Sequence, residues 1–129
     1  MKVITLKQPW ATLVAEGIKE YEFRSWKTNY RGKLLIHAGS GIDKEEMKKF
    51  EHLNLEYPSK RIIAEVELID CLLLDENLNK KIIEENNIAY GSKKRTGYAW
   101  KLKNAKKINL EKEINGKLGL WNYDIEENT

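Results

Sequence analysis

The sequence predicts an α+β fold in which short strands form a small mixed or antiparallel β-barrel flanked by two or three helices. Apolar and polar residues alternate over several short segments, as they do in strands that bury one face. Two or three segments between them repeat their apolar residues with helical spacing. The loops joining these segments are too short for repeated parallel crossovers, which favours a barrel over a doubly wound sheet.

Length and composition indicate that residues 1–129 form a single domain, since there is no internal repeat and no Pro/Gly-rich linker. With 41% hydrophobic and 33% charged residues, the chain can build a core, which excludes wholesale disorder. The single cysteine, Cys71, lies in an apolar run and is expected to be a half-buried hydrophobe. No apolar segment is long enough to cross a bilayer and no leader pattern opens the chain, so we expect a soluble cytoplasmic protein without a membrane partner.

The first elements follow from local signals. Residues 3–6 read as a strand, and Pro9 occupies the first turn of a helix that stops at Gly17. Residues 20–26 then alternate strictly, so the strand has one face for the core and one for chemistry. The core face would carry Tyr21 and Phe23, and the other face Glu20, Glu22, Arg24 and Trp26.

The remaining elements are marked by turns and caps. Asp43 and Glu46 resemble a capping box, which predicts a helix with an apolar stripe of Met47, Phe50 and Leu53. A turn at residues 30–32 precedes that helix and opens a strand that ends at a glycine-rich segment. The predicted ranges are 33–37 for this strand, 61–71 for the longest strand, 77–87 for a third helix, and 98–108 and 117–121 for the last two strands.

Charge is distributed unevenly, although the net charge is only +3. Residues 88–110 contain seven lysines and arginines and no acid, a pattern that suits phosphate; the alternative is a solvated lysine-rich surface. Within this stretch, the polar loop 92–97 is predicted to clamp phosphate at the rim of a site. The cations of this loop are Lys93, Lys94 and Arg95.

The densest group of unusual residues lies between positions 8 and 26. Lys19 and Arg24 offer a point charge and a planar fork for phosphate, and Glu22 lies beside Arg24 on the same strand face. Indole rings could stack on bases, each contributing about 1–3 kcal/mol. Other interpretations stay open: Glu22 and Arg24 could simply pair on a solvated strand, and Trp100 could belong to the core.

The ordered motifs of the chain resemble those of the ASCH domain family. The first is Gly17-x-Lys19-x-x-Glu22-x-Arg24, preceded by a Gln-Pro-Trp-Ala segment at 8–11. Later matches are segments 30–32, 35–38, 97–102 and 116–121, so the resemblance covers nearly the whole chain. It implies a PUA-like barrel with a charged, tryptophan-lined cleft for RNA or a nucleoside-like ligand. The ligand-binding candidates are Gln8, Trp10, Lys19, Glu22, Arg24, Trp26 and Trp100.

A binding module is the first functional interpretation, and two alternatives remain. Some relatives sharing the barrel are N4-acetylcytidine amidohydrolases in which a lysine activates a threonine; Lys19 matches that lysine, but Glu22 replaces the threonine. A carboxylate is a poor acyl acceptor, which argues against this activity. A ribonuclease could use Lys19, Glu22 or His37 to move protons or stabilise charge. A protein-interaction adaptor is the other alternative; no metal or cofactor is expected, and the oligomeric state is left open.

Overall fold

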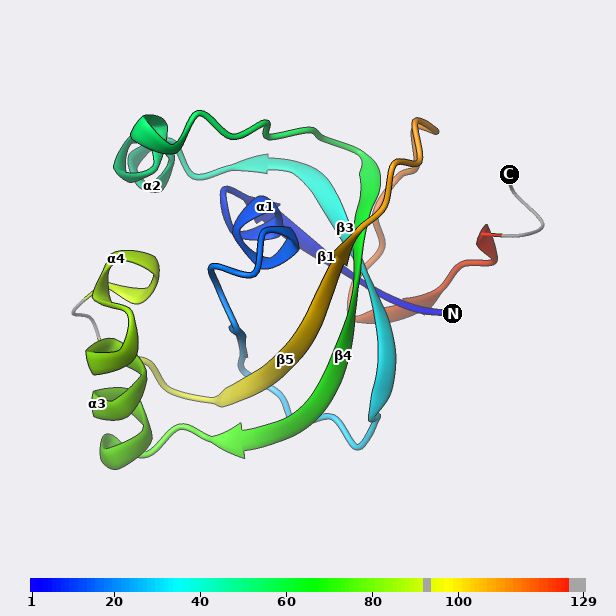
Figure 1. The fold of residues 1–129 in the computed structure, drawn as a ribbon. Coiled ribbons are helices and arrows are strands. Elements are labelled where there is room, and N and C mark those ends of the chain that lie inside the picture. Colours follow the sequence, from blue (N-terminus) through cyan, green and yellow to red (C-terminus); the bar gives the residue numbers. More distant parts are fainter. Residues whose placement is uncertain (92–93, 126–129) are drawn as a thin grey trace.

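The computed structural model describes residues 1–91 and 94–125, and over these ranges it contains a six-stranded sheet, four α-helices and a short 3₁₀-helix, η1 (Figure 1). The strands are β1 (Lys2–Gln8), β2 (Tyr21–Arg24), β3 (Gly32–Ile42), β4 (Arg61–Leu73), β5 (Tyr98–Lys107) and β6 (Leu120–Asn122). The helices are α1 (Trp10–Ala15), α2 (Lys44–Lys49), η1 (Glu51–Leu53), α3 (Glu76–Glu85) and α4 (Asn87–Tyr90). None of these helices is long and apolar enough to cross a membrane.

The sheet is mixed, with strand order β2-β5-β4-β3-β1-β6. The β1–β3 pair is parallel and the other neighbouring pairs are antiparallel. The strands curve strongly around α1 (Figure 1), but within the described residues β2 and β6 are not hydrogen-bonded to each other. The predicted α+β class is therefore confirmed as a small curled sheet with flanking helices, open between its two end strands.

Helix α1 fills the inside of the curled sheet. Every residue from 11 to 15 is buried, and the helix packs against β1, β3, β4 and β5. A helix that is buried on all sides belongs to a core. The side chain of Gln8 fixes the start of this helix. Its Oε1 accepts a hydrogen bond from Thr12 N at 3.0 Å, and its Nε2 donates to the Pro58 carbonyl at 2.9 Å.

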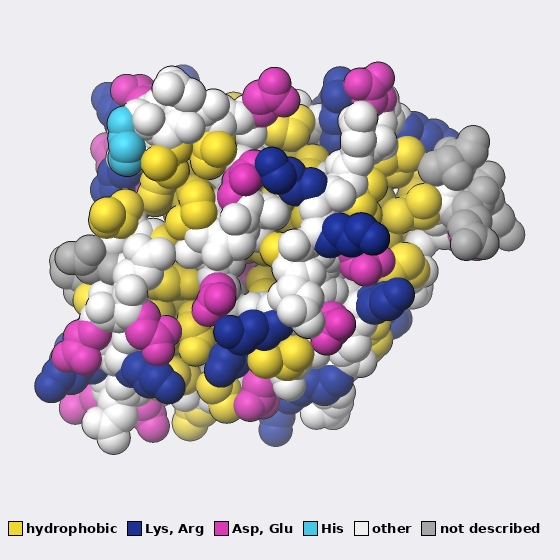
Figure 2. Space-filling view, in the orientation of Figure 1, with side chains coloured by type: hydrophobic (Ala, Val, Ile, Leu, Met, Phe, Trp, Pro, Cys, Tyr) yellow, Lys and Arg dark blue, Asp and Glu magenta, His cyan; other side chains and the backbone are white. Residues whose placement is uncertain are grey.

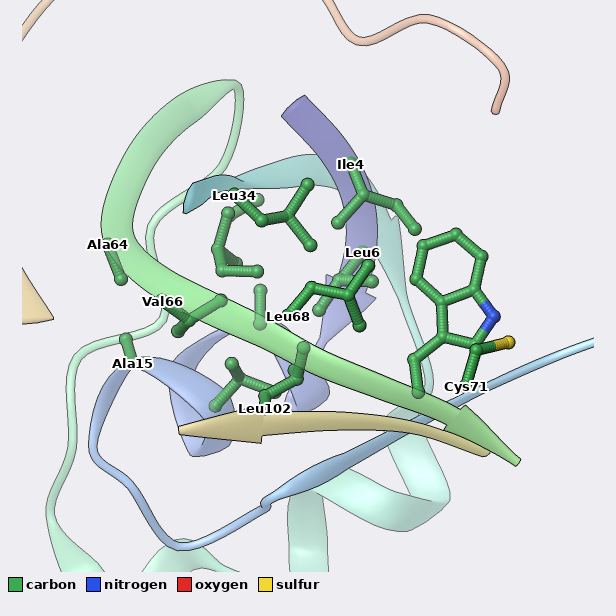
Figure 3. Packing of buried hydrophobic residues seen from close by; sticks show 14 residues of the cluster. Ile4, Leu6, Ala15, Leu34, Ala64, Val66, Leu68, Cys71 and Leu102 are labelled. Carbon is green, nitrogen blue, oxygen red and sulfur yellow. The ribbon is translucent and has the colours of Figure 1, made fainter. Parts of the chain in front are cut away.

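The main core lies between α1 and the inner face of the sheet. Figure 3 shows the apolar side chains of four strands converging there, among them Leu6, Leu34, Val66 and Leu102. Trp100 belongs to this cluster and is 0% exposed. Two smaller clusters extend the core. One joins α3 and α4 to β2 and β5, and the other lies beneath the segment that leads to β6 and includes Trp121.

Several predicted boundaries differ from the structure. The predicted third helix is split, because Asn86 leaves the helical conformation and its side-chain Oδ1 caps α4 by accepting from Ala89 N at 3.1 Å. Helix α2 ends at Lys49, so Phe50 is buried while Leu53 is 37% exposed, and the predicted common stripe is wrong. The last strand covers 120–122 instead of 117–121.

Candidate ligand-binding cleft

A cleft of about 750 Å³ opens where β1, β2 and the end of β3 meet the loop preceding β6. Its walls come from segments far apart in the sequence, which the curvature of the sheet brings together. The lining residues are Thr5, Leu6, Lys7, Trp10, Lys19, Glu22, Phe23, Arg24, Gly39, Ser40, Gly41, Arg95, Gly116, Lys117, Leu118 and Gly119. Four of the predicted ligand-binding residues, Trp10, Lys19, Glu22 and Arg24, therefore share one site.

Lys19 is buried at the edge of β2, where it is only 3% exposed. Its Nζ donates a hydrogen bond to the Tyr21 carbonyl and lies 3.6 Å from the Glu22 carboxylate. The ammonium also lies 4.4 Å from the centre of the Phe23 ring and 5.3 Å from that of Tyr90. Burial lowers the pKa of Lys19 from 10.5 to about 8, although the neighbouring carboxylate opposes this shift.

Glu22 holds the cationic side chains of this wall together. One carboxylate oxygen accepts from Phe23 N at 3.2 Å, and the other accepts from the Arg24 guanidinium at 3.0 Å. The same guanidinium donates to the Thr5 carbonyl at 2.9 Å, which ties β2 to β1 across the cleft. The geometry makes Glu22 a counter-ion and a backbone cap.

Tyr90 supports this wall from behind. Its hydroxyl oxygen accepts hydrogen bonds from Glu20 N at 2.7 Å and Tyr21 N at 3.1 Å, and its ring packs edge-to-face on Tyr21 and Phe23. Burial raises the pKa of Tyr90 to about 12. Tyr90 carries no local sequence signal for this role, because nothing near position 90 indicates that α4 folds back onto β2.

The predicted alternation over residues 20–26 is only partly confirmed. Tyr21 is buried, as expected, and Glu22 and Arg24 face the cleft. Phe23 also lines the cleft and is half-buried, because β2 is an end strand whose outer edge is not covered by a further strand in the described structure. Alternation of apolar and polar residues predicts which face of a sheet a side chain is on. It does not predict what covers a strand at the edge of the sheet.

Three other predicted residues do not line the cleft. Gln8 is fully buried and its amide holds α1 and the segment around Pro58. Trp100 is a core residue, so its ring offers no free face for a base. Trp26 is 36% exposed but packs edge-to-face on Trp100, outside the cleft.

His37, a catalytic candidate from the sequence, lies beneath the cleft floor and is 0% exposed. A carbonyl can only accept, so His37 Nε2 donates to the Ile114 carbonyl at 2.6 Å. The neutral imidazole then accepts at Nδ1 from the Thr5 hydroxyl at 3.2 Å, and that hydroxyl accepts from Trp121 Nε1 at 3.1 Å. This chain of bonds joins the segment around residue 114 to β1 and β3, so the contacts that His37 makes are structural.

The cations of the basic stretch separate into two groups. Arg95 lines the cleft, with its guanidinium carbon 4.4 Å from the centre of the Phe23 ring. Lys94 is exposed, does not line the cleft, and lies 3.9 Å from Glu76; Lys93 lies outside the described residues.

The lysines of β5 face acids instead of a ligand. Trp100 and Leu102 are buried, so the neighbouring lysines project outward as the strand parity predicts. The register places three of the four lysines of β5 opposite an acid of β4. The pairs are Lys101 with Asp70, Lys103 with Glu67 and Lys106 with Glu65. On the face shown in Figure 2, basic and acidic side chains are interleaved, which favours the alternative of a solvated lysine-rich surface over a phosphate stripe along β5.

The second wall of the cleft was not anticipated. Gly116, Lys117, Leu118 and Gly119 line it, and Leu118 is 99% exposed. The predicted strand 117–121 covers most of this segment, but the strand begins only at Leu120, and the two flanking glycines are the signal for a loop. Within the described ranges, no group of three or more His, Cys, Asp or Glu side chains could hold a metal ion.

Comparisons with known proteins agree on one family. The family model described as "ASCH domain" matches residues 4–112. Activating signal cointegrator 1 of Mus musculus is 28% identical over 133 residues, and that of Homo sapiens 30% over 134 residues. Each match covers 94% of this chain, which spans 22% of the length of those relatives.

Two similar solved structures come from Zymomonas mobilis. The crystal structure of ASCH from that organism has a TM-score of 0.59 at 17% identity, covering 98% of this chain and 90% of the other. A point mutant of the same protein has a TM-score of 0.60 at 17% identity, covering 98% and 92%. At this level of identity, the two structures support the fold alone.

Proposed function

Since this chain belongs to the ASCH domain family, we propose that its cleft binds RNA or a free nucleotide through phosphate groups and one base. The chain acts as a binding module, with Lys19, Arg24 and Arg95 as the phosphate-binding cations. Trp10 is the aromatic surface available to a base, because it lines the cleft and is only partly buried.

The charge of the cleft is the observation that carries this proposal. Among the described residues that line it, five are basic and one is acidic. The basic residues are Lys7, Lys19, Arg24, Arg95 and Lys117. The single acid, Glu22, already accepts hydrogen bonds from Phe23 N and the Arg24 guanidinium. A cleft with this excess of positive charge favours an anionic ligand.

The size of the cleft fits the same class of ligand. Its volume of about 750 Å³ lies within the range of pockets that enclose small organic ligands, roughly 300–1,000 Å³. A nucleotide, or one or two residues of a single strand, has this size and combines phosphate with a flat ring.

A salt series tests the proposal. A short fluorescein-labelled single-stranded RNA is titrated with the protein, and the affinity is measured by anisotropy at increasing salt. We expect log affinity to fall linearly with log salt, with a slope of about −0.7 for each phosphate contact. Arg24→Gln should make that slope shallower by about 0.7, the value for one phosphate contact.

The matched control is Lys106→Gln, which removes one positive charge from the exposed, acid-paired face of β5. It should leave the slope unchanged. Binding that is insensitive to salt, or equal effects of both substitutions, would rule out a phosphate-binding cleft.

A hydrolase is the second candidate, favoured by the pKa of Lys19 of about 8, which suits a proton carrier near neutral pH. Against it, Glu22 is engaged as a counter-ion, and a carboxylate is a poor acyl acceptor. We expect RNA and N4-acetylcytidine to be recovered intact after incubation with the protein. Product formation that is lost in Lys19→Met would replace the binding module by a hydrolase.

A further inference from the structure

We propose that Asn79 is a positioning residue of the cleft, which fixes Arg95 so that its guanidinium is held ready for a phosphate group. This inference rests on the proposed function, because it assigns a role within the same anion-binding site. It also links α3, which carries Asn79 and does not itself line the cleft, to the binding of ligand.

Asn79 holds the backbone of Arg95 at two points. Its side-chain Oδ1 accepts a hydrogen bond from Arg95 N at 2.9 Å, and its Nδ2 donates to the Arg95 carbonyl, also at 2.9 Å. The same Nδ2 donates to the Asp75 carbonyl at 3.0 Å, which fixes the amide on the first turn of α3. Asn79 is only 6% exposed, so water competes little for these bonds.

The side chain of Arg95 then extends from this fixed backbone into the cleft. Its guanidinium donates to the Tyr90 carbonyl and lies over the Phe23 ring, with 4.4 Å between the guanidinium carbon and the ring centre. A cation–π contact uses no N–H donors, so it orients the guanidinium in addition to the hydrogen bond to the Tyr90 carbonyl.

A fixed backbone is needed because the cleft collects like charges. Lys19 lies over the same Phe23 ring, and the charge of Arg95 contributes to lowering the pKa of Lys19. Arg95 belongs to neither a helix nor a strand. If its backbone were loose, the guanidinium could move away from Lys19, and a ligand would have to order the side chain on binding.

The experiment measures RNA affinity against salt for Asn79→Ala, Arg95→Gln and the double variant, with the labelled single-stranded RNA as probe. Arg95→Gln should weaken binding several-fold and make the slope shallower by about 0.7. Asn79→Ala removes no charge, yet it should also make the slope shallower. The double variant should bind like Arg95→Gln alone, because Asn79 acts only through Arg95.

Ile82→Ala is the matched control, because it removes a neutral, buried side chain from the same helix, outside the cleft. It should lower the melting temperature and leave the slope unchanged. All affinities are measured at a temperature at which circular dichroism shows each variant to be folded. If Asn79→Ala does not fold, Asn79→Ser takes its place, with the same expected change in slope.

The possible failures are distinguishable. The inference would be overturned if the Asn79 variant kept the wild-type slope. It would also be overturned if the Asn79 substitution weakened binding as much in the Arg95→Gln background as in the wild type. Either result would make Asn79 merely structural. An unchanged slope in Arg95→Gln, with a shallower one in Arg24→Gln, would also overturn it while leaving the proposed function intact. If the wild-type protein shows no salt-dependent RNA binding, the proposed function itself fails.

Discussion

The ammonium group of Lys19 has two roles. It completes the hydrogen bonding of the Tyr21 carbonyl at the edge of β2, and it contributes positive charge to the cleft. Because the side chain is buried, Lys19→Ala would leave a polar carbonyl without its partner, which costs about 1–3 kcal/mol.

The protonation of Lys19 should make ligand binding depend on pH. With a pKa of about 8, the free protein carries the charge below this pH and loses it above. Since an anionic ligand favours the charged form, RNA affinity should decline as the pH rises through about 8, well below the ordinary pKa of lysine. Anisotropy titrations from about pH 7 to pH 9 measure this.

Lys19→Met is the control for that profile. It should bind RNA more weakly and with an affinity that is nearly constant over the same pH range, because arginine does not titrate there. A wild-type profile as flat as that of Lys19→Met would show that the charge of Lys19 does not act on the ligand.

His37 should make stability depend on pH at the acidic side. Burial lowers the pKa of His37 below 6.5, although the bond to the Ile114 carbonyl opposes this shift. The unfolded chain then binds the proton more readily than the folded one, so the stabilisation is complete above about pH 6.5 and declines as the pH falls below it. Urea unfolding at a series of pH values measures the effect.

His37→Asn should reduce that dependence below about pH 6.5. It should also lower stability at neutral pH, since the Ile114 carbonyl and the Thr5 hydroxyl lose their partner. The same loss of stability at every pH, with an unchanged slope in this range, would contradict a neutral, buried imidazole.

Among the elements, β2 is an end strand whose open edge is satisfied by side chains. Tyr90 accepts from the N–H groups of Tyr21 and of Glu20, the residue before the strand. Lys19 donates to the Tyr21 carbonyl, and Glu22 accepts from Phe23 N. An edge capped in this way is protected from pairing with another strand. It also brings a carboxylate and an ammonium to the wall of the cleft, so the capping of β2 and the chemistry of the site share the same residues.

The segment 116–119 forms the opposite wall, and Leu118 provides its apolar surface. We expect Leu118→Ser to weaken RNA binding by about fivefold, the effect of about 1 kcal/mol of apolar burial against a base or sugar. Because Leu118 is 99% exposed without ligand, the melting temperature should stay nearly unchanged. Anisotropy and thermal unfolding measure the two quantities.

Leu73→Ser is the matched control, since Leu73 is 65% exposed and lies outside the cleft. It should leave the affinity unchanged. An equal loss of affinity in both variants, or none in Leu118→Ser, would mean that the wall does not contact the ligand.

In the whole molecule, positive charge is concentrated in the cleft, because many lysines outside it lie beside acidic residues. Three of the four lysines of β5 lie opposite acids of β4, and Lys103 and Lys107 form ion pairs with Glu20 and Glu16. The cleft contains several cations and one engaged carboxylate. A net charge of only +3 is thus compatible with a strongly positive site.

By itself, the sequence determined the family, the α+β class and four residues of the site, Trp10, Lys19, Glu22 and Arg24. These depend on local spacing, such as the motif around Lys19 and the alternation along the strands. Each can be read within a short window of residues, because helical and strand periodicities are local properties of the chain.

Which residues complete the site, and how they behave, follows from the packing of the elements. Leu118 and Arg95 reach the cleft because the sheet curls and α4 folds back on β2, and Trp100 is withdrawn into the core by the same curvature. The pairing of Lys101 with Asp70 follows from strand register. Contacts between segments far apart in the chain, and the burial that lowers the pKa of Lys19, depend on how the elements pack, which no local pattern encodes.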